Sequence, residues 1–543
     1  MKQEYITGIT IGPITKLLGQ ARKTRELWAA SYTLSLFAKI VLEELVVDKT
    51  IEILMPHTDI FKALSLPENN GVGIAPDRIV LKSTDNYLTK AKTATSEAIK
   101  KLAEIIAKHL IINKDLIVAE LEDTLRIYAA CVELKPETNI LAELNTTLDQ
   151  LELQCHYKQK DNNAYLLKFF TNVNKGKNNS FLTAYFKNFE RNSDFNGHYR
   201  IPSVLEITTK PIFQKLPIEY KTIGNKYLWN DKDENDIDSK ELEFFNEISN
   251  LKDSFNNNIF NKYHKYYALI YADGDKIGKY IKSLTSIDEL VKLSKEFISS
   301  AQTGYQILLN YGALPLYIGG DDYLFLAPIV GNESNGLTKP TIANLCEVIR
   351  NNFKNHFEKI SSEIDLTFAV SIHYYKFPLF EIMDNMYNLL RNVKDNVPGN
   401  GKFSIQLTHH SGNPISAVFQ MDSEEFKTWN NIMNTMNEST INQNMLYKIR
   451  EFESVWKETD HQGIINFFND TMRLKYNDKN DKFTDIAFLD NLKINTPEKR
   501  ESEMYNFHIK QMLSYHYPAR NSVNTKPYNS LRIANFLKGF ENV

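Results

Sequence analysis

The stretch LYIGGDDYLFL, residues 316–326, decides the fold of the second half of this chain. Two short runs of apolar residues flank two glycines and two aspartates. Apolar runs of this length, bounded by glycine and aspartate, are typical of two strands joined by a tight turn. The stretch therefore predicts a β-hairpin with Gly319, Gly320, Asp321 and Asp322 at or beside its tip.

The segments on either side of this hairpin predict a complete sheet over 265–410. A strand over KYYALIYA is followed by helices over KIGKYIKSL and IDELVKLSKEFISSAQTGYQILLNYG, and then by the hairpin. After the hairpin come a helix over TIANLCEVIRNNFKNHFEKISS, a strand over DLTFAVSIHYY, a helix over PLFEIMDNMYNLLRNVKD and a strand over GKFSIQLTHH. This β-α-β-β-α-β order, with additional helix, is that of the split-βαβ, ferredoxin-like fold. The predicted fold class is therefore α+β.

Two further aspartates, Asp273 and Asp275, end the first predicted strand in the motif ADGD. In a ferredoxin-like sheet the second strand of the hairpin lies beside the first strand of the sheet, so the hairpin tip approaches that strand's end. We therefore expect Asp273 to lie near Asp321, although 321 − 273 = 48 positions separate them. Converging carboxylates are costly to bury unless a cation neutralises them. Oxygen ligands with few nearby histidines favour Mg²⁺ or Mn²⁺, and two such ions can hold a triphosphate.

Glycines around these aspartates are compatible with a nucleotide site. Glycine permits positive φ and lets a phosphate approach the backbone closely, and the chain has Gly274, Gly278, Gly319 and Gly320 here. The helix predicted to begin near Lys276 can offer backbone N–H groups to phosphate oxygens. The alternative is an ordinary turn, because glycine and aspartate are favoured in any hairpin. The motif ADGD ends the strand that is expected to lie beside the hairpin, and this second acidic motif favours a metal site over an ordinary turn.

Length and composition narrow the class of protein. A chain of 543 residues is too long for one core, and 24% charged with 42% hydrophobic residues is ordinary for a globular protein. The net charge of −3 gives no global basic signature, so any nucleic-acid contact is expected to be local or shared with partner subunits. The three cysteines lack Cys-x-x-Cys spacing, so we expect no zinc site. Without a membrane-length apolar run or a signal-peptide pattern, we expect a cytoplasmic protein with no membrane contact.

The stretches YYALIYADGDKIGK and LPLYIGGDDYLFLAP resemble the GGDD-bearing Palm domain of the large subunit of type III CRISPR effector complexes. SIHYYKFPLFE is similar to the strand-to-helix step that follows in that family. ITIGPITKLLGQARKTRELWAASYTLS is similar to the opening of the family's first Palm domain in the Cmr-type, III-B branch. The resemblance is specific over 1–40 and 265–410 and weak between them.

The resemblance implies two Palm domains and four parts of the chain. These are a first Palm domain over 1–115, a mainly helical insert over 116–260, a second Palm domain over 261–412 and a helical C-terminal domain over 413–543. The first Palm domain is expected to be catalytically silent, because ITIGPI has no acidic residue where the second has ADGD. Within the insert, HYRIPSVLEITTKP at 198–211 predicts a loop followed by a strand.

The resemblance also implies a reaction. A hydroxyl of one nucleotide attacks the α-phosphate of ATP and pyrophosphate leaves, giving cyclic oligoadenylate in most members of the family. The implied catalytic and metal-binding residues are Asp273, Asp321 and Asp322, with Mg²⁺ or Mn²⁺ as two bound ions. The implied nucleotide-contacting residues are Gly274, Asp275, Lys276, Gly278, Gly319, Gly320 and Lys402. The implied partners are guide RNA, an activating target RNA and the other subunits of a Cmr-type ribonucleoprotein.

The sequence leaves alternatives open. Short forms of the family include a branch that joins AMP to S-adenosylmethionine, and the sequence does not select the acceptor. A non-catalytic, RNA-binding scaffold is a second alternative, although a scaffold has no need for clustered carboxylates. A free-standing diguanylate-type cyclase usually has Glu and Phe in the hairpin, where this chain has GGDDY. No His-Asp dipeptide occurs, so we expect no HD nuclease domain.

Overall fold

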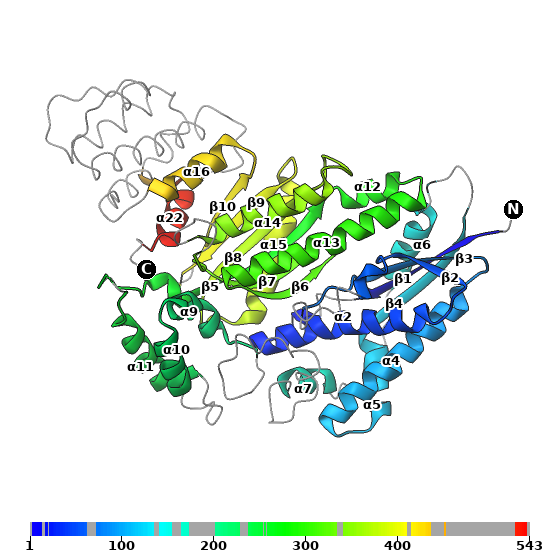
Figure 1. Ribbon diagram of the computed structural model, residues 1–543, viewed down its shortest axis with the longest axis horizontal. Helices are drawn as coiled ribbons and strands as arrows, with labels where there is room; N and C mark the ends of the chain where they lie inside the picture. Colours follow the sequence, from blue (N-terminus) through cyan, green and yellow to red (C-terminus); the bar gives the residue numbers. More distant parts are fainter. Residues whose placement is uncertain are drawn as a thin grey trace.

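The fold is described from a computed structural model of the chain. The structure describes residues 3–12, 17–19, 21–61, 72–134, 139, 141–154, 164–172, 201–228, 237–253, 255–256, 258–333, 340–409, 414–435, 450–451 and 527–539. Two sheets and the helices around them make up most of this part of the chain (Figure 1). The α+β class predicted from the sequence is confirmed.

The larger sheet has six strands in the order β10-β9-β8-β5-β7-β6. Its strands are β5 (Tyr266–Asp275), β6 (Leu314–Gly319), β7 (Asp322–Pro328), β8 (Asp365–Tyr374), β9 (Lys402–Thr408) and β10 (Pro414–Gln420). β6 and β7 form the predicted hairpin, and β7 pairs antiparallel with β5. The split-βαβ order is therefore confirmed. β10 pairs with β9 and extends this sheet beyond residue 412, into the segment expected to be a helical domain.

Side chains of β5 alternate between two cores. Ile270 faces a core shared with α13 and α14, whereas Leu269 faces a core shared with α15 and α2. The helices concerned are α2 (Thr24–Val46), α13 (Ile287–Tyr311), α14 (Ile342–Phe357) and α15 (Leu379–Asn396). Because strand side chains alternate with a period of two, Tyr271, Asp273 and Asp275 share the α15 face with Leu269. This alternation decides which helix supplies the neighbours of the acidic motif.

The smaller sheet has four strands in the order β2-β3-β1-β4. They are β1 (Tyr5–Gly12), β2 (Ile51–Met55), β3 (Arg78–Ser83) and β4 (Arg126–Glu133). α2 and α4 (Leu88–Leu110) share one core with this sheet, and α6 (Ala142–Glu152) packs on the opposite face of β1 and β4. β4 pairs with β1 along its whole length, so this sheet continues beyond the predicted boundary at residue 115.

Helix α2 and the segment before β3 join the two sheets. The Ser31 hydroxyl donates to the carbonyl of Leu316 on β6 at 3.0 Å, so α2 contacts the edge of the larger sheet directly. The N–H of Ile318 donates to the carbonyl of Gly73 at 2.8 Å, and the N–H of Gly73 donates to the carbonyl of Leu316 at 3.3 Å. The backbone of β6, the last strand in its sheet, is therefore paired with the N-terminal half of the chain.

The segment expected to be a helical insert contains β4 and several helices. The helices are α5 (Lys114–Thr124), α6, α7 (Tyr165–Asn172), α9 (Val204–Lys215), α10 (Pro217–Ile223) and α11 (Ile237–Ser249). The strand predicted within 198–211 is wrong over its described part, because α9 occupies it. A capping box starts this helix, in which Ser203 Oγ accepts from the N–H of Glu206 and Glu206 Oε2 accepts from the N–H of Ser203.

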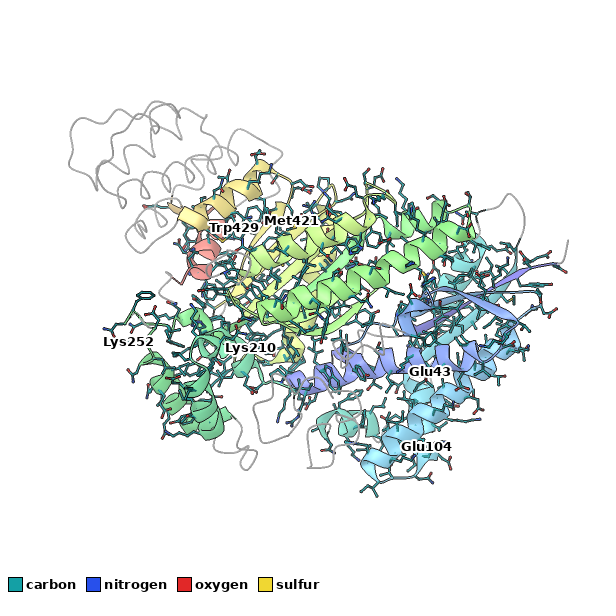
Figure 2. All side chains as sticks on the ribbon, viewed as in Figure 1. Glu43, Glu104, Lys210, Lys252, Met421 and Trp429 are labelled. Carbon is teal, nitrogen blue, oxygen red and sulfur yellow. The ribbon has the colours of Figure 1, made fainter. Side chains whose placement is uncertain are left out.

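In the C-terminal region the structure describes two helices, α16 (Glu424–Thr435) and α22 (Pro527–Leu537). Trp429 lies near Met421, where β10 leads into α16 (Figure 2). Its indole N–H donates to the carbonyl of Ser530 at 2.9 Å, and its ring stacks on Phe419 with centroids 4.8 Å apart. Both helices are thus fixed to the larger sheet. The remainder of the predicted helical domain lies outside the described residues.

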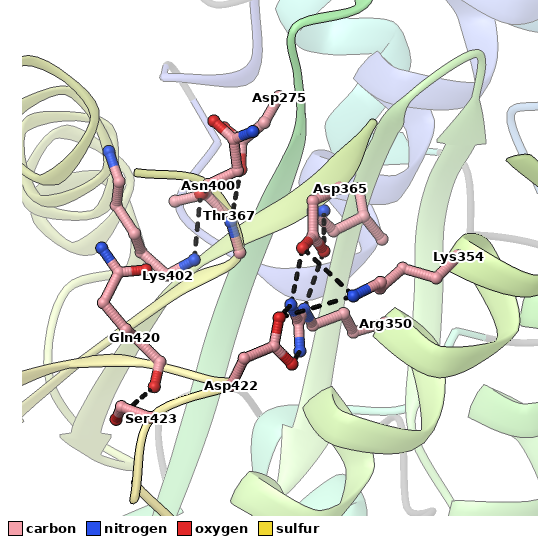
Figure 3. Close-up of polar contacts among 12 residues, drawn as sticks. Asp275, Arg350, Lys354, Asp365, Thr367, Asn400, Lys402, Gln420, Asp422 and Ser423 are labelled. Atoms are coloured by element: carbon pink, nitrogen blue, oxygen red, sulfur yellow. Dashed lines mark hydrogen bonds and ion pairs between the residues drawn. The ribbon is translucent and has the colours of Figure 1, made fainter. Parts of the chain in front are cut away.

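A buried ion-pair network fixes α14 to the end of the larger sheet (Figure 3). The Arg350 guanidinium is 4% exposed and donates to both carboxylate oxygens of Asp365, at 2.7 and 2.5 Å. It also donates to both oxygens of Asp422, at 2.7 and 2.6 Å. Removal of one partner from such a pair leaves a buried charge without compensation.

Arg350→Met is expected to lower the free energy of unfolding by about 3–5 kcal/mol, the usual cost of breaking a buried ion pair. Denaturant unfolding of the purified protein measures this loss. Lys354→Met is the matched control, because Lys354 is 38% exposed and lies 3.8 Å from Asp365. It is expected to cost less than about 1 kcal/mol. Equal losses for the two variants would contradict the prediction.

Candidate functional site

Asp273 and Asp321 lie together at the junction of β5 and the hairpin. A methyl group placed on Gly274 would lie 2.6 Å from both Cβ and Oδ2 of Asp321, so the hairpin touches the backbone beside Asp273. The absence of a side chain at Gly274 is what permits this approach. The proximity predicted from the topology is therefore present in the structure.

The carboxylates at the hairpin hold their protons more tightly than ordinary aspartates. Burial, together with the charge of Asp273, raises the pKa of Asp321 to about 7. Burial, and then the charges of Asp321 and Asp273, raise the pKa of Asp322 well above its usual value. Both effects arise because several negative charges share a site with little water. A bound cation would remove this penalty.

Lys394, on α15, supplies a positive charge to this cluster. Its ammonium forms an ion pair with Asp273 and donates to the carbonyl of Gly274 at 3.0 Å. It also lies 3.5 Å from Oδ1 of Asp275. Sequence reasoning missed this residue, because a lysine on an amphipathic helix ordinarily lies in solvent. The signal that could have found it is the alternation along β5, which directs Asp273 and Asp275 toward α15.

Asp322 is turned toward a tyrosine pair. The Tyr271 hydroxyl donates to Oδ1 of Asp322 at 2.9 Å, and the ring of Tyr387 meets the ring of Tyr271 edge-on with centroids 5.3 Å apart. These three side chains line one cavity. Asp322 therefore faces the space between the two sheets.

Two cavities meet at the hairpin. The larger, of about 390 Å³, lies between the two sheets and is lined from one side by Thr10, Asp77, Arg78, Arg126 and Glu152, and from the other by Tyr271, Asp322 and Tyr387. The smaller, of about 130 Å³, has apolar walls that include Met55, Ile277, Ile281 and Phe297, and it reaches Gly319, Gly320 and Asp321. Asp322 lines both cavities. The two cavities therefore lie on either side of the hairpin carboxylates.

One wall of the larger cavity is formed by the smaller sheet, and this wall carries both acidic and basic side chains. Glu152 accepts hydrogen bonds from the hydroxyl of Thr10 at 2.7 Å and from Arg78 at 3.3 Å. Arg78 also donates to Asp149 at 2.7 Å, so two carboxylates already neutralise it. Asp77 adds a further carboxyl group to this wall.

The other predicted contacts divide into accessible and buried residues. Gly320 has φ +64°, as the hairpin requires, and a side chain at Gly278 would meet no atom within 4 Å. Lys276 is exposed at the start of α12 (Ile277–Ser283), with φ +64°. Lys402 is 3% exposed and its ammonium donates to two backbone carbonyls of α15. The structure therefore does not support the predicted phosphate contact of Lys402.

The side chain of Asp275 is also too buried to contact a nucleotide. It is 7% exposed, and its Oδ2 accepts from the hydroxyl of Thr367 at 2.7 Å and from the N–H of Gly401 at 2.8 Å. Its predicted place among the nucleotide contacts is therefore not supported. Its neighbours connect it to Lys394 instead.

The residues fit a magnesium ion that is shared with a substrate. Among the described residues, no three His, Cys, Asp or Glu side chains already stand as a ready metal cluster. Asp273 and Asp321 nevertheless converge, and burial together with the charge of Asp273 raises the pKa of Asp321 to about 7. Mg²⁺ is usually bound by one or two carboxylates together with phosphate oxygens and water. This donor pair meets that requirement once a triphosphate supplies the remaining ligands.

Metal binding is expected to weaken as pH falls through about 7, because a proton then competes for Asp321. Mn²⁺ should therefore raise the melting temperature more at pH 8 than at pH 6. Without metal, the raised pKa means that the folded state holds this proton more tightly than the unfolded chain. The contribution of Asp321 to stability then declines as pH rises from 3.8 to about 7. A Mn²⁺ effect independent of pH, or retained in Asp321→Asn, would contradict this prediction.

Two family models match the chain over both sheets. The model for the Cas10/Cmr2 second palm domain matches residues 266–402, and the model for the N-terminal domain of the CRISPR-associated protein Cmr2 matches residues 6–108. The chain contains two domains that match those of the Cas10/Cmr2 family. The first match contains Asp273, the hairpin and Lys394, so the carboxylates of the candidate site lie inside the matched palm domain.

A curated relative is the CRISPR system Cmr subunit Cmr2 of Pyrococcus furiosus, 27% identical over 175 residues. That match covers 27% of this chain and 19% of the relative, so it spans about a fifth of the relative's length. The type III-B Cmr-beta cryo-EM structure in the apo state contains a similar fold, with a TM-score of 0.59 at 12% identity. That match covers 93% of this chain and 81% of the other.

The Cmr-beta structure bound to cognate target RNA gives a TM-score of 0.55 at 11% identity, over 94% of this chain and 83% of the other. At these identities the likeness shows that this chain has the fold of those chains. Within the described residues, no helix is long and apolar enough to cross a membrane.

Proposed function

We propose that this chain is a nucleotidyltransferase that uses ATP, as the large subunit of a type III-B CRISPR ribonucleoprotein activated by target RNA. The observation that carries the proposal is the group formed by Asp273, Asp321 and Asp322, placed where two cavities meet. The proposed partners are guide RNA, target RNA and the other Cmr subunits. The proposed product is cyclic oligoadenylate, a second messenger.

The proposed reaction joins two nucleotides. A hydroxyl of the acceptor loses its proton to water while its oxygen forms a bond to the α-phosphorus of ATP. The bond from that phosphorus to the bridging oxygen breaks, and pyrophosphate leaves. Asp273 and Asp321 would hold Mg²⁺ or Mn²⁺, which neutralises phosphate charge and activates the attacking hydroxyl when bound. Lys394 balances the remaining charge of Asp273. Asp322 faces the larger cavity and orients the acceptor there.

Transfer of AMP to S-adenosylmethionine is the second candidate, and the carboxyl groups of Asp77 and Glu152 on the wall of the larger cavity favour it. Asp77 and Glu152 lie on this wall, and Arg78 is already paired with carboxylates. A sulfonium and an ammonium group suit these carboxyl groups better than a second triphosphate does, because opposite charges attract and like charges repel. Asp77→Asn and Glu152→Gln are therefore expected to reduce transfer to S-adenosylmethionine.

The deciding experiment uses the complex assembled with guide RNA and partner subunits. Matching target RNA, Mg²⁺ and α-³²P-labelled ATP are added with and without S-adenosylmethionine, and the products are separated. Oligoadenylates from ATP alone, lost in the Asp321→Ala, Asp322→Ala double variant, support the first candidate. A product that requires S-adenosylmethionine supports the second. No turnover under any condition would leave a non-catalytic RNA-binding scaffold and overturn both.

A further inference from the structure

We propose that Asp275 and Lys402 are positioning residues that together hold Lys394 against the carboxylate of Asp273. The inference rests on the proposed function, because it assigns these residues to the same nucleotide site. Neither residue needs to touch the substrate. They act by fixing the side chain and the backbone of Lys394.

The side chain of Lys394 is held from β5. Its ammonium lies 3.5 Å from Oδ1 of Asp275 and donates to the carbonyl of Gly274 at 3.0 Å, while it pairs with Asp273. Asp275 cannot turn away, because its Oδ2 is occupied by the hydroxyl of Thr367 and the N–H of Gly401. A buried carboxylate with one oxygen fixed in this way presents the other oxygen to Lys394.

The backbone of Lys394 is held from β9. The ammonium of Lys402 donates to the carbonyl of Val393 at 3.2 Å and to the carbonyl of Lys394 at 3.4 Å, near the C-terminal end of α15. A cation at this end of a helix also interacts favourably with the helix dipole. The two contacts fix the point from which the side chain of Lys394 extends.

The ion-pair network of Arg350 lies next to Asp275 and has no hydrogen bond to it among the described residues (Figure 3). Asp275 is the strand partner of Asp365, which Arg350 binds with two hydrogen bonds. Gly401, which donates to Asp275, has φ +65°, and a methyl group on it would lie 2.5 Å from Nη2 of Arg350. The guanidinium therefore packs tightly against the backbone at Gly401, which donates to Asp275.

The test measures binding of α,β-methylene ATP with Mn²⁺ to the full chain by calorimetry, because this analogue cannot lose pyrophosphate. Asp275→Asn keeps the hydrogen-bond acceptor and removes the charge that attracts Lys394. We expect it to weaken binding about tenfold, and Lys394→Ala to weaken it at least as much. Because Asp275 acts through Lys394, the double variant should bind no more weakly than Lys394→Ala alone. Independent, multiplying losses would overturn the proposal.

Asp365→Asn is the matched control, since it replaces an equally buried aspartate on the neighbouring strand that Arg350 binds. It should lower the melting temperature and leave nucleotide binding unchanged. An equal loss of binding in Asp365→Asn and Asp275→Asn would show a general structural effect and overturn the inference.

Lys402→Met tests the same arrangement from β9 if Asp275→Asn does not fold. We expect it to weaken nucleotide binding several-fold, and unchanged binding in a folded Lys402→Met would overturn the inference. Failure of the wild type to bind the analogue, or binding unchanged in Asp273→Ala, contradicts the proposed function itself. Wild-type binding that depends on Asp273 but not on Asp275 contradicts this inference alone.

Discussion

Asp321→Asn is expected to lower the rate of nucleotide transfer on the order of 10³-fold, equivalent to about 4 kcal/mol of transition-state stabilisation. The substitution keeps the size of the side chain beside Gly274 and removes the charge that, with Asp273, would hold the metal ion. The measurement is product formation by the assembled complex at saturating ATP and Mg²⁺. Because the substitution keeps the packing and removes a charge that burial and Asp273 penalise, the melting temperature should not fall below that of the wild type.

Asp288→Asn is the control for this prediction, since Asp288 is an exposed aspartate in the first turn of α13. Its rate should match that of the wild type. A rate for Asp321→Asn within a few-fold of the wild type would show that the cluster is not the catalytic centre.

Gly274→Ala is expected to reduce the rate about 100-fold through geometry alone. The new methyl group would lie 2.6 Å from Oδ2 of Asp321 and 2.8 Å from Cγ1 of Ile277, so the hairpin must move away from β5. A displacement of about 1 Å between catalytic groups can cost this much. Steady-state kinetics of the assembled complex measure the effect, and circular dichroism checks the fold.

Lys279→Ala is the control here, because it changes an exposed residue of α12 whose ion pair, with Glu363, is 3.5 Å long and on the surface. It should leave the rate unchanged. Full activity in Gly274→Ala would mean that Asp321 need not lie against β5 during the reaction.

The sequence predicted the meeting of Asp273 and Asp321 because topology alone requires it. Once β5, β6 and β7 were assigned from apolar runs, their order in a ferredoxin-like sheet placed the hairpin beside the end of β5. The same reasoning could not place Lys394, which lies 121 residues from Asp273 on a helix whose rotation about its axis no local pattern fixes. Lys402 was misjudged for a related reason, since burial of its ammonium depends on the position of the end of α15.

Two errors of secondary structure have separate physical causes. The stretch that becomes α9 contains the β-branched residues Thr208 and Thr209, which favour strands, yet its capping box of Ser203 and Glu206 was a readable start signal for a helix. The sequence of strand β4 contains no comparable signal for its conformation. It is an edge strand with most side chains half-buried, and its strand conformation follows from pairing with β1, which is more than a hundred positions away.

The pairing of β6 with the backbone around Gly73 has a consequence for the evolution and dissection of the chain. An unpaired edge strand of a β-sheet can pair with a strand of another molecule, and proteins usually cover such edges. Here the N-terminal half protects the strand that leads into the GGDD turn. A C-terminal half expressed alone would expose β6 as an unpaired edge strand, next to its own carboxylates. We therefore expect the two halves to be encoded and expressed as one chain.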